Sequence, residues 1–467
     1  MKIIDLAALG AIGAVTAYYL LVPKKEIRKA DFPTRRGWPL IGNLLDVIGS
    51  DLTQIVHSHN GPFYITLPGF TQPLLIFDDP ELLKQVLGRS IPSRVIIGEP
   101  TFSTIFGSES LFGVIGKDHK RLRALCSRSV AATAMRNQFV NLDGLIKESL
   151  SKMAAASASS RGGILPLEFT MQLTFDAICV FMVGSDENQL IRLRDLHSDF
   201  LDINRGLIAE FLPFSGSAVA KALAARDRIF AFVAEIANER RHNTQDSESA
   251  KTDALGSFIE SRDEFGGSLS DLEIGHLFLT MCVAGTETTA KQICSLLYFL
   301  TTKISAVDLS ALQQEVSAPY ELSEDLLSKL PLLDGFIKES MRISLVVPAV
   351  IRVTTEDSIF AGKAIPAGTF LYPMRDLPSL AGPDFQLQRF VGPDSFEKTH
   401  PGEYIPFGAG DRMCLGFQLA KLEMKLFIAE LLHSYDITAG AGKPSKSYFP
   451  AQFVQSRVVL RKKEGEE

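Results

Sequence analysis

A cysteine in a glycine-rich loop is the residue of this 467-residue chain whose surroundings most clearly favour chemistry. Cys414 lies in FGAGDRMCLG, directly before FQLAKLEM, whose apolar spacing predicts a helix. Backbone amides and a helix N-terminus lower the pKa of a thiol, and a bound metal lowers it further. Gly410 and Gly416 let the backbone turn tightly beside a flat group. The pattern favours a thiolate at Cys414, although an isolated cysteine at a helix start is usually only a buried apolar residue.

A second chemical segment, AGTETTA at residues 284–290, lies inside an apolar stretch that predicts one long helix from about 268 to 300. Ala284 and Gly285 are small enough to let another group approach the helix. Glu287 and Thr288 are an acid and an alcohol, which together can deliver protons. The alternative is that the threonines only bond back to helix carbonyls.

The loop around Cys414 resembles the cysteine-ligand loop of the cytochrome P450 monooxygenases, F-x-x-G-x-R-x-C-x-G. The matching residues are Phe407, Gly410, Arg412, Cys414 and Gly416. The resemblance continues in the family's order from near Pro33 to near Val459. It implies haem b with Cys414 as the axial ligand of an iron that binds O2.

The same resemblance implies roles for other residues. Glu287 and Thr288 would deliver protons to iron-bound oxygen, and Ala284 and Gly285 would let the helix cross the haem face. The two haem propionates need cationic partners, since each charge-assisted hydrogen bond contributes about 1.5–3 kcal/mol. The residues that match the family's propionate ligands are His119, Arg123, Arg352 and Arg412. A solvated basic face is the alternative for the helix DHKRLR, which carries the first two.

Glu339 and Arg342 match the family's E-x-x-R, and their spacing places them on one helix face. In the family this pair binds an arginine of a later meander and holds the fold beneath the haem. Arg389 is the candidate third member. The segment GPDFQLQRFVGPDSF departs from the family because it lacks Pro-Glu before Arg-Phe.

The pattern of apolar residues along the chain predicts a fold that is mainly α-helical with a minor β portion. The resemblance implies one large haem domain. Apolar spacing predicts helices near 117–130, 136–155, 166–183, 187–205, 217–241, 268–300 and 415–433. Ser270 and Glu273 form a capping-box pattern before the long helix, and Pro331 suits the first turn of another. Short β-prone runs predict a hairpin between about 60 and 80, and strands in AVIRVTT, SIFAGKAI and GTFLYPM.

Composition excludes several other classes of protein. A net charge of -6 over 467 residues predicts no nucleic-acid partner. The five cysteines are odd in number and lack Cys-x-x-Cys spacing, so neither a disulfide framework nor a zinc site fits. Cys179, Cys282 and Cys294 lie among apolar neighbours and are predicted to be buried.

The N-terminus predicts a membrane anchor. Residues 3–22 are apolar over about the length that crosses a bilayer, and six basic residues follow within 24–36. We therefore expect an anchor at 1–23, a basic, proline-bearing linker at 24–45 and a catalytic domain at 46–467 that faces the cytosol from the endoplasmic reticulum. A cleaved signal peptide and a buried core helix are the alternatives.

The sequence has no dinucleotide loop and no iron–sulfur cysteine set, so electrons must come from another protein. The resemblance implies a membrane-bound NADPH reductase carrying FAD and FMN, with Lys421 and Lys425 as candidate docking cations.

The apolar segments 101–112 and 346–350 match the family's pocket-lining regions and imply a lipophilic substrate. Likeness to one branch of the family favours a sterol, retinoid or other isoprenoid. Two alternatives stay open: a haem-thiolate isomerase or dehydratase of lipid hydroperoxides, and a membrane-tethered haem or lipid sensor without activity.

Overall fold

The structure of the chain is a computed structural model. It describes residues 31–38, 42–43, 46, 52–67, 72–88, 90–95, 101–130, 132–209, 216–242, 253–317, 323–375, 378–380, 382, 384–447 and 452–463. The predicted anchor and most of the linker lie outside these residues. Within them, no helix combines the length and apolar character needed to cross a membrane.

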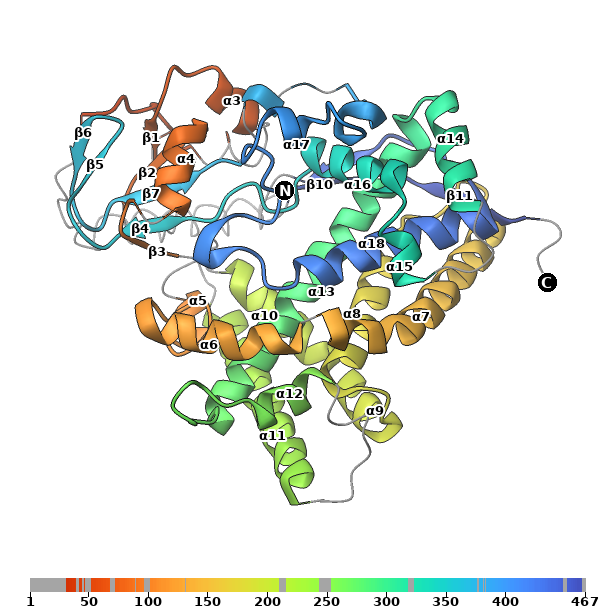
Figure 1. Ribbon diagram of the computed structural model, residues 1–467, viewed down its shortest axis with the longest axis horizontal. Helices are drawn as coiled ribbons and strands as arrows, with labels where there is room; N and C mark the ends of the chain where they lie inside the picture. Colours follow the sequence, from red (N-terminus) through yellow and green to blue (C-terminus); the bar gives the residue numbers. More distant parts are fainter. Residues whose placement is uncertain are drawn as a thin grey trace, which may run out of the picture.

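Helices dominate the described chain, as predicted (Figure 1). Their bounds are α3 Leu52–His57, α4 Pro80–Leu87, α5 Thr101–Phe106, α6 Gly116–Ser129, α7 Ala132–Ser159, α8 Leu167–Val183, α9 Glu187–Asp195, α10 His197–Ala209, α11 Gly216–His242, α12 Ala254–Glu260, α13 Asp271–Thr302, α14 Ala306–Ser317, α15 Glu324–Leu327, α16 Pro331–Ile343, α17 Phe396–Thr399 and α18 Phe417–Ser434. Short 3-10 helices are η2 Pro378–Leu380, η3 Leu387–Phe390 and η4 Gly410–Arg412.

Most predicted helices are confirmed, including the capping box at Ser270, whose side chain and that of Glu273 bond each other's backbone amides. The stretch predicted as one helix over 187–205 is two helices, α9 and α10. Leu196 leaves the helical conformation at φ -80 and ψ 4, and its amide bonds back to the end of α9. The ring of the next residue, His197, then packs against Phe175 at 4.4 Å. Tertiary contact therefore divides a continuous apolar pattern.

The strands in the described part of the chain form one five-stranded sheet and three two-stranded sheets. Their bounds are β1 Phe63–Ile65, β2 Leu74–Phe77, β3 Ser93–Val95, β4 Arg352–Thr354, β5 Ser358–Phe360, β6 Lys363–Ile365, β7 Phe370–Pro373, β8 Tyr435–Ala439, β9 Ser445–Ser447, β10 Phe453–Gln455 and β11 Val458–Lys462. The large sheet has the order β1-β2-β7-β4-β3, in which only β2 and β7 run parallel. The predicted hairpin at 60–80 is its β1–β2 edge.

The long helix α13 crosses the middle of the molecule, packed by α8 and α11, and α18 lies beside it (Figure 1). At 32 residues it is about 48 Å long. Most of its side chains are buried, and they join the largest apolar core. The predicted burial of Cys179, Cys282 and Cys294 is confirmed. The core thus fixes α13 rigidly, so that the segment AGTETTA has a defined position.

Candidate active site

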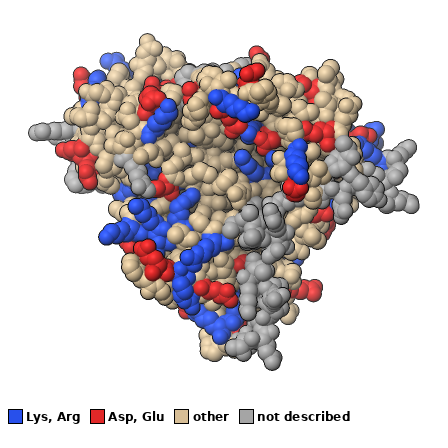
Figure 2. All heavy atoms as spheres, in the orientation of Figure 1, with Lys and Arg blue, Asp and Glu red and all other residues tan. Residues whose placement is uncertain are grey.

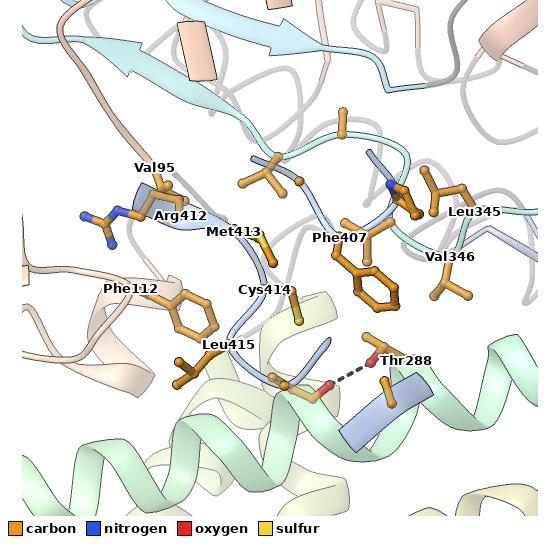
Figure 3. Close-up of a pocket in the computed structure, with 18 of the residues that line it drawn as sticks. Val95, Phe112, Thr288, Leu345, Val346, Phe407, Arg412, Met413, Cys414 and Leu415 are labelled. Atoms are coloured by element: carbon orange, nitrogen blue, oxygen red, sulfur yellow. Dashed lines mark hydrogen bonds between the residues drawn. The ribbon is translucent and has the colours of Figure 1, made fainter. Parts of the chain in front are cut away.

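A cavity of about 660 Å³ lies between α13 and the loop that precedes α18. This size is within the range of cofactor and ligand sites in proteins. Its walls are mainly apolar, and they include parts of both segments predicted to line the pocket: Phe106, Leu111 and Phe112 from the first, and Val346 to Val350 from the second. Cys414 and Thr288 both lie at this cavity (Figure 3).

The loop around Cys414 is closed by its own backbone. The amide of Cys414 donates a hydrogen bond to the carbonyl of Phe407 at 2.8 Å. The side chain of Cys414 is exposed and lines the cavity, and burial is nevertheless the largest influence on its pKa, so the thiol faces the internal cavity rather than the protein surface. Phe407 lies next to it and packs near Phe417, the first residue of α18, with ring centroids 6.2 Å apart.

Glycine has a different structural role at each of the two loop positions, 410 and 416. Gly410 has a φ of +68, and a Cβ there would lie 2.2 Å from the carbonyl oxygen of Leu87. The loop can therefore pack against the end of α4 only with glycine at this position. Gly416 has an ordinary φ of -85, and no described atom lies within 4 Å of its would-be Cβ. Both glycines lie in turns, as expected, but only Gly410 has a φ that requires glycine, whereas the missing side chain of Gly416 leaves space at the cavity.

The pKa of Cys414 differs from the sequence expectation. Burial raises the pKa of this thiol, while the Gly416 amide and the Arg375 and Arg123 guanidinium groups offset only part of the rise. The loop alone does not produce a thiolate because removing water from sulfur disfavours its charge. A metal bound to sulfur deprotonates it outright, so the predicted thiolate depends on a ligated metal.

Four predicted residues of α13 line the cavity: Ala284, Gly285, Glu287 and Thr288. Thr288 donates its hydroxyl proton to the carbonyl of Ala284 at 2.7 Å, which leaves the oxygen lone pairs available (Figure 3). Glu287 forms an ion pair with Lys291, one turn further along the helix. The missing side chain of Gly285 makes room for Ile178 of α8, since a Cβ at position 285 would lie 3.1 Å from the Ile178 side chain.

Cations gather at one end of the cavity. The predicted residues His119, Arg123, Arg352 and Arg412 all line it. Burial, followed by repulsion from Arg412 and Arg123, lowers the pKa of His119 to about 4, so this histidine is neutral at pH 7 and can donate one N–H. Arg412 is held by the carbonyls of Leu111 and Val114. The structure therefore brings the four residues together from α6, β4 and the Cys414 loop.

Sequence reasoning missed a further cation at the cavity, Arg375. It lies just after β7, is buried, and donates to the carbonyl of Pro406 at 2.6 Å. Burial lowers the pKa of Arg375 to about 10, and the charge of Cys414 acts in the opposite direction. The surrounding residues, YPMRDLP, form neither a helical spacing nor a loop motif that would mark Arg375 as a site residue. The pairing of β7 within the large sheet is what brings it to the cavity.

These residues fit a haem. Arg352 and Arg375 are buried arginines whose Nε atoms have no hydrogen-bond partner among the described residues. Burial lowers the pKa of both to about 10, and the nearby Asp411 and Cys414 groups offset only part of that change. An anion next to them would relieve that cost. A flat group with two carboxylates, facing Cys414 and α13, satisfies both the cations and the cavity.

A cavity-facing cysteine opposite an acid–alcohol pair, in a mainly helical fold with a cation-lined cavity, defines a haem-thiolate protein. The family model for Cytochrome P450 matches residues 32–463, and the chain belongs to that family. The resemblance seen in the sequence is thereby confirmed. The family uses haem with a cysteine thiolate ligand and O2, and the protein is an oxidoreductase.

Known proteins similar to this chain are distant relatives. Beta-amyrin 11-oxidase of Glycyrrhiza uralensis is 25% identical, over 86% of this chain and 84% of its own. Abscisic acid 8'-hydroxylase 1 of Arabidopsis thaliana is 24% identical, over 97% and 96%. The solved structure of retinoic acid bound cyanobacterial CYP120A1 has a TM-score of 0.80 at 22% identity, and it covers 93% of this chain and 100% of its own. That likeness supports the fold.

Proposed function

We propose that this chain is a monooxygenase of a sterol, retinoid or other isoprenoid. One atom of O2 enters a C–H bond of the substrate and the other leaves as water, with two electrons from NADPH and two protons completing the balance. The observation that carries the proposal is the position of Cys414 at a mainly apolar cavity also lined by Glu287 and Thr288. The bound haem supplies the oxygen chemistry.

Two relatives support an isoprenoid substrate, because β-amyrin and abscisic acid, after which they are named, are both isoprenoids. The apolar walls of the cavity agree with such a substrate, since they exclude water and accept a lipophilic molecule.

In the proposed reaction, Thr288 and Glu287 handle protons. The Thr288 hydroxyl, oriented by the Ala284 carbonyl, has free lone pairs toward the cavity region. Glu287 is half-buried and forms an ion pair with Lys291, which orients the carboxylate beside the cavity. His119, Arg123, Arg352 and Arg412 hold the haem carboxylates.

We further propose that an NADPH reductase carrying FAD and FMN supplies the electrons. The lysines singled out in the sequence are poorly placed to attract it. Lys421 lies over the ring of Phe407, and Lys425 forms an ion pair with Asp334 at 2.9 Å.

Helix α6 offers a better docking surface for the reductase. Figure 2 shows Lys and Arg gathered where α6 lies in Figure 1, and Lys117, Lys120 and Arg128 of this helix are exposed. This surface suits an acidic electron donor.

Membrane attachment through residues 1–23, with the catalytic domain facing the cytosol from the endoplasmic reticulum, remains part of the proposal. Attachment can be tested by fractionating cells that express the chain with and without these residues. Release of the shortened chain into the soluble fraction is the expected result.

The central test is the absorption spectrum of the dithionite-reduced protein with carbon monoxide. A strongly red-shifted Soret band that disappears in Cys414→Ala is expected, because the band reports a thiolate opposite the gas. A band at the shorter wavelength of histidine-ligated haem, or no haem at all, would contradict the proposal. Dependence of product formation on O2 and NADPH then separates a monooxygenase from a haem-thiolate isomerase or dehydratase, which needs neither.

A further inference from the structure

Thr280 lies on the cavity side of α13, two helical turns before Thr288. Only 4% of the residue is exposed, and its hydroxyl oxygen has no hydrogen-bond partner among the described residues. Thr286 and Thr288 of the same helix behave differently, since each donates to the carbonyl four residues earlier at 2.7 Å. The hydroxyl of Thr280 is therefore unsatisfied in an element where a satisfying bond is normally at hand.

A second unsatisfied polar atom lies one turn away. His276 is also buried, and its Nδ1 atom has no partner among the described residues. Asn204 of α10, a helix in contact with α13, lines the same cavity. Most other residues that line the cavity, such as Ile178, Leu207 and Val283, are apolar. Thr280 and Asn204 are thus polar positions in a mainly apolar cavity, and burying the Thr280 hydroxyl without a partner is unfavourable unless a ligand or water completes it.

We propose that Thr280 determines substrate specificity by forming a hydrogen bond with an oxygen of the substrate. The inference rests on the proposed function and specifies its substrate more closely. The substrate class is a mostly apolar isoprenoid that carries a hydroxyl or carbonyl group. Threonine in a helix occupies either of two side-chain rotamers, so rotation about Cα–Cβ exchanges the hydroxyl and the methyl group at the cavity wall.

The position of Thr280 also sets where oxidation takes place. With a rise of about 1.5 Å per residue, eight residues of helix separate Thr280 from Thr288 by about 12 Å. The substrate oxygen therefore binds far from the proton-delivering alcohol. The C–H bond that reacts lies at the opposite end of the molecule from the existing oxygen.

Binding of matched ligands to the haem-loaded ferric protein tests this inference without turnover. The probes are farnesol, retinol and β-amyrin, each paired with its deoxygenated hydrocarbon, and binding is followed by the shift of the Soret band. For at least one pair, the wild-type protein should bind the alcohol about tenfold more tightly than the hydrocarbon, which is the effect of one good hydrogen bond. Thr280→Val keeps the shape and should abolish that preference by weakening the alcohol alone.

Three results would overturn the inference: equal affinity within every pair, no binding of any of the three alcohols, or a preference that survives Thr280→Val. An ordered water on the hydroxyl would give the first of these. Thr286→Val is the matched control, because its hydroxyl is bonded to Cys282 and it does not line the cavity. This variant should retain the preference for the alcohol.

Thermal unfolding of the same preparations gives a second readout. Because the Thr280 hydroxyl has no partner to lose, Thr280→Val should unfold at the same or a higher temperature than wild type. A drop of several degrees would show that the hydroxyl is bonded inside the protein, which contradicts the inference. The carbon monoxide spectrum distinguishes failure of the proposed function from failure of this inference. A missing thiolate band refutes the proposed function, whereas a normal band without alcohol preference refutes only the role of Thr280.

Discussion

The carboxylate of Glu339 accepts two hydrogen bonds from the guanidinium group of Arg342, both at 2.8 Å and both fully buried. Arg342 also donates to the carbonyls of Leu380, Gly382 and Asp384, and so ties α16 to the segment after β7. Arg389, the third member predicted from the sequence, contacts Glu339 at 3.2 Å with a partly exposed side chain. The triad thus joins three separate segments of the chain.

Removing one partner of this buried pair should be severely destabilising. Glu339→Gln leaves the Arg342 cation without its counter-charge, and breaking such a pair costs about 3–5 kcal/mol. We expect little haem-containing protein and a much lower unfolding temperature. Arg389→Ala should have a clearly smaller effect because its contact is longer and more exposed. Equal losses in the two variants would contradict this ranking.

The proton-delivery proposal predicts a specific failure for Thr288→Val. Loss of an acid–base group lowers rate by about 10²- to 10⁴-fold, so product formation should fall strongly while the thiolate band with carbon monoxide persists. The measurement is product formed per NADPH oxidised, which should also fall. Thr301→Val, whose hydroxyl bonds to Leu297 away from the cavity, is the control and should behave as wild type. Unchanged coupling in Thr288→Val would refute its role.

Arg352 should matter for holding haem rather than for folding. Its pKa is lowered to about 10, chiefly by burial, so the buried cation is unfavourable until a further anion binds beside it. Arg352→Leu should therefore lose haem to an acceptor apoprotein at least tenfold faster, as expected for one missing charge-assisted bond. Arg457→Leu, which removes a bond to the carbonyl of Gly163 outside the cavity, is the control. Equal haem loss in both would argue against a propionate ligand.

Glu423 of α18 predicts a pH effect on stability. Burial raises the pKa of this cavity-lining acid from 4.5 to about 8. The folded state therefore holds the proton more tightly than the unfolded chain, so the contribution to stability is greatest below pH 4.5 and is lost progressively up to about pH 8. Glu423→Gln should unfold at a higher temperature than wild type at pH 8 and at nearly the same temperature at pH 5. A constant difference across this range would contradict the argument.

The docking surface on α6 can be tested by charge reversal. Lys117→Glu with Lys120→Glu should slow reduction by an NADPH reductase at low ionic strength, with a smaller difference at high salt because exposed charges are screened. Reduction by dithionite should not change. The matched control reverses the exposed Lys443 and Lys446 near β9. If both double variants are slowed equally, the donor does not recognise α6.

Much of this protein was determined by the sequence alone. The Cys414 loop, the AGTETTA segment, the capping box at Ser270 and the three-residue spacing of Glu339 and Arg342 depend on neighbouring residues, so their geometry follows from local rules of turns and helices. The family and the main helices were predicted correctly for the same reason.

Only the tertiary structure decided features that depend on burial and on contacts between distant segments. It brought Arg375 to the cavity through the pairing of β7, divided α9 from α10 at Leu196, and raised the pKa of Cys414 where the loop alone predicts a lowered one. It also left the hydroxyl of Thr280 without a hydrogen-bond partner among the residues that the structure describes. Loss of solvent and packing across the chain set these properties, and neither is encoded in the spacing of residues along one segment.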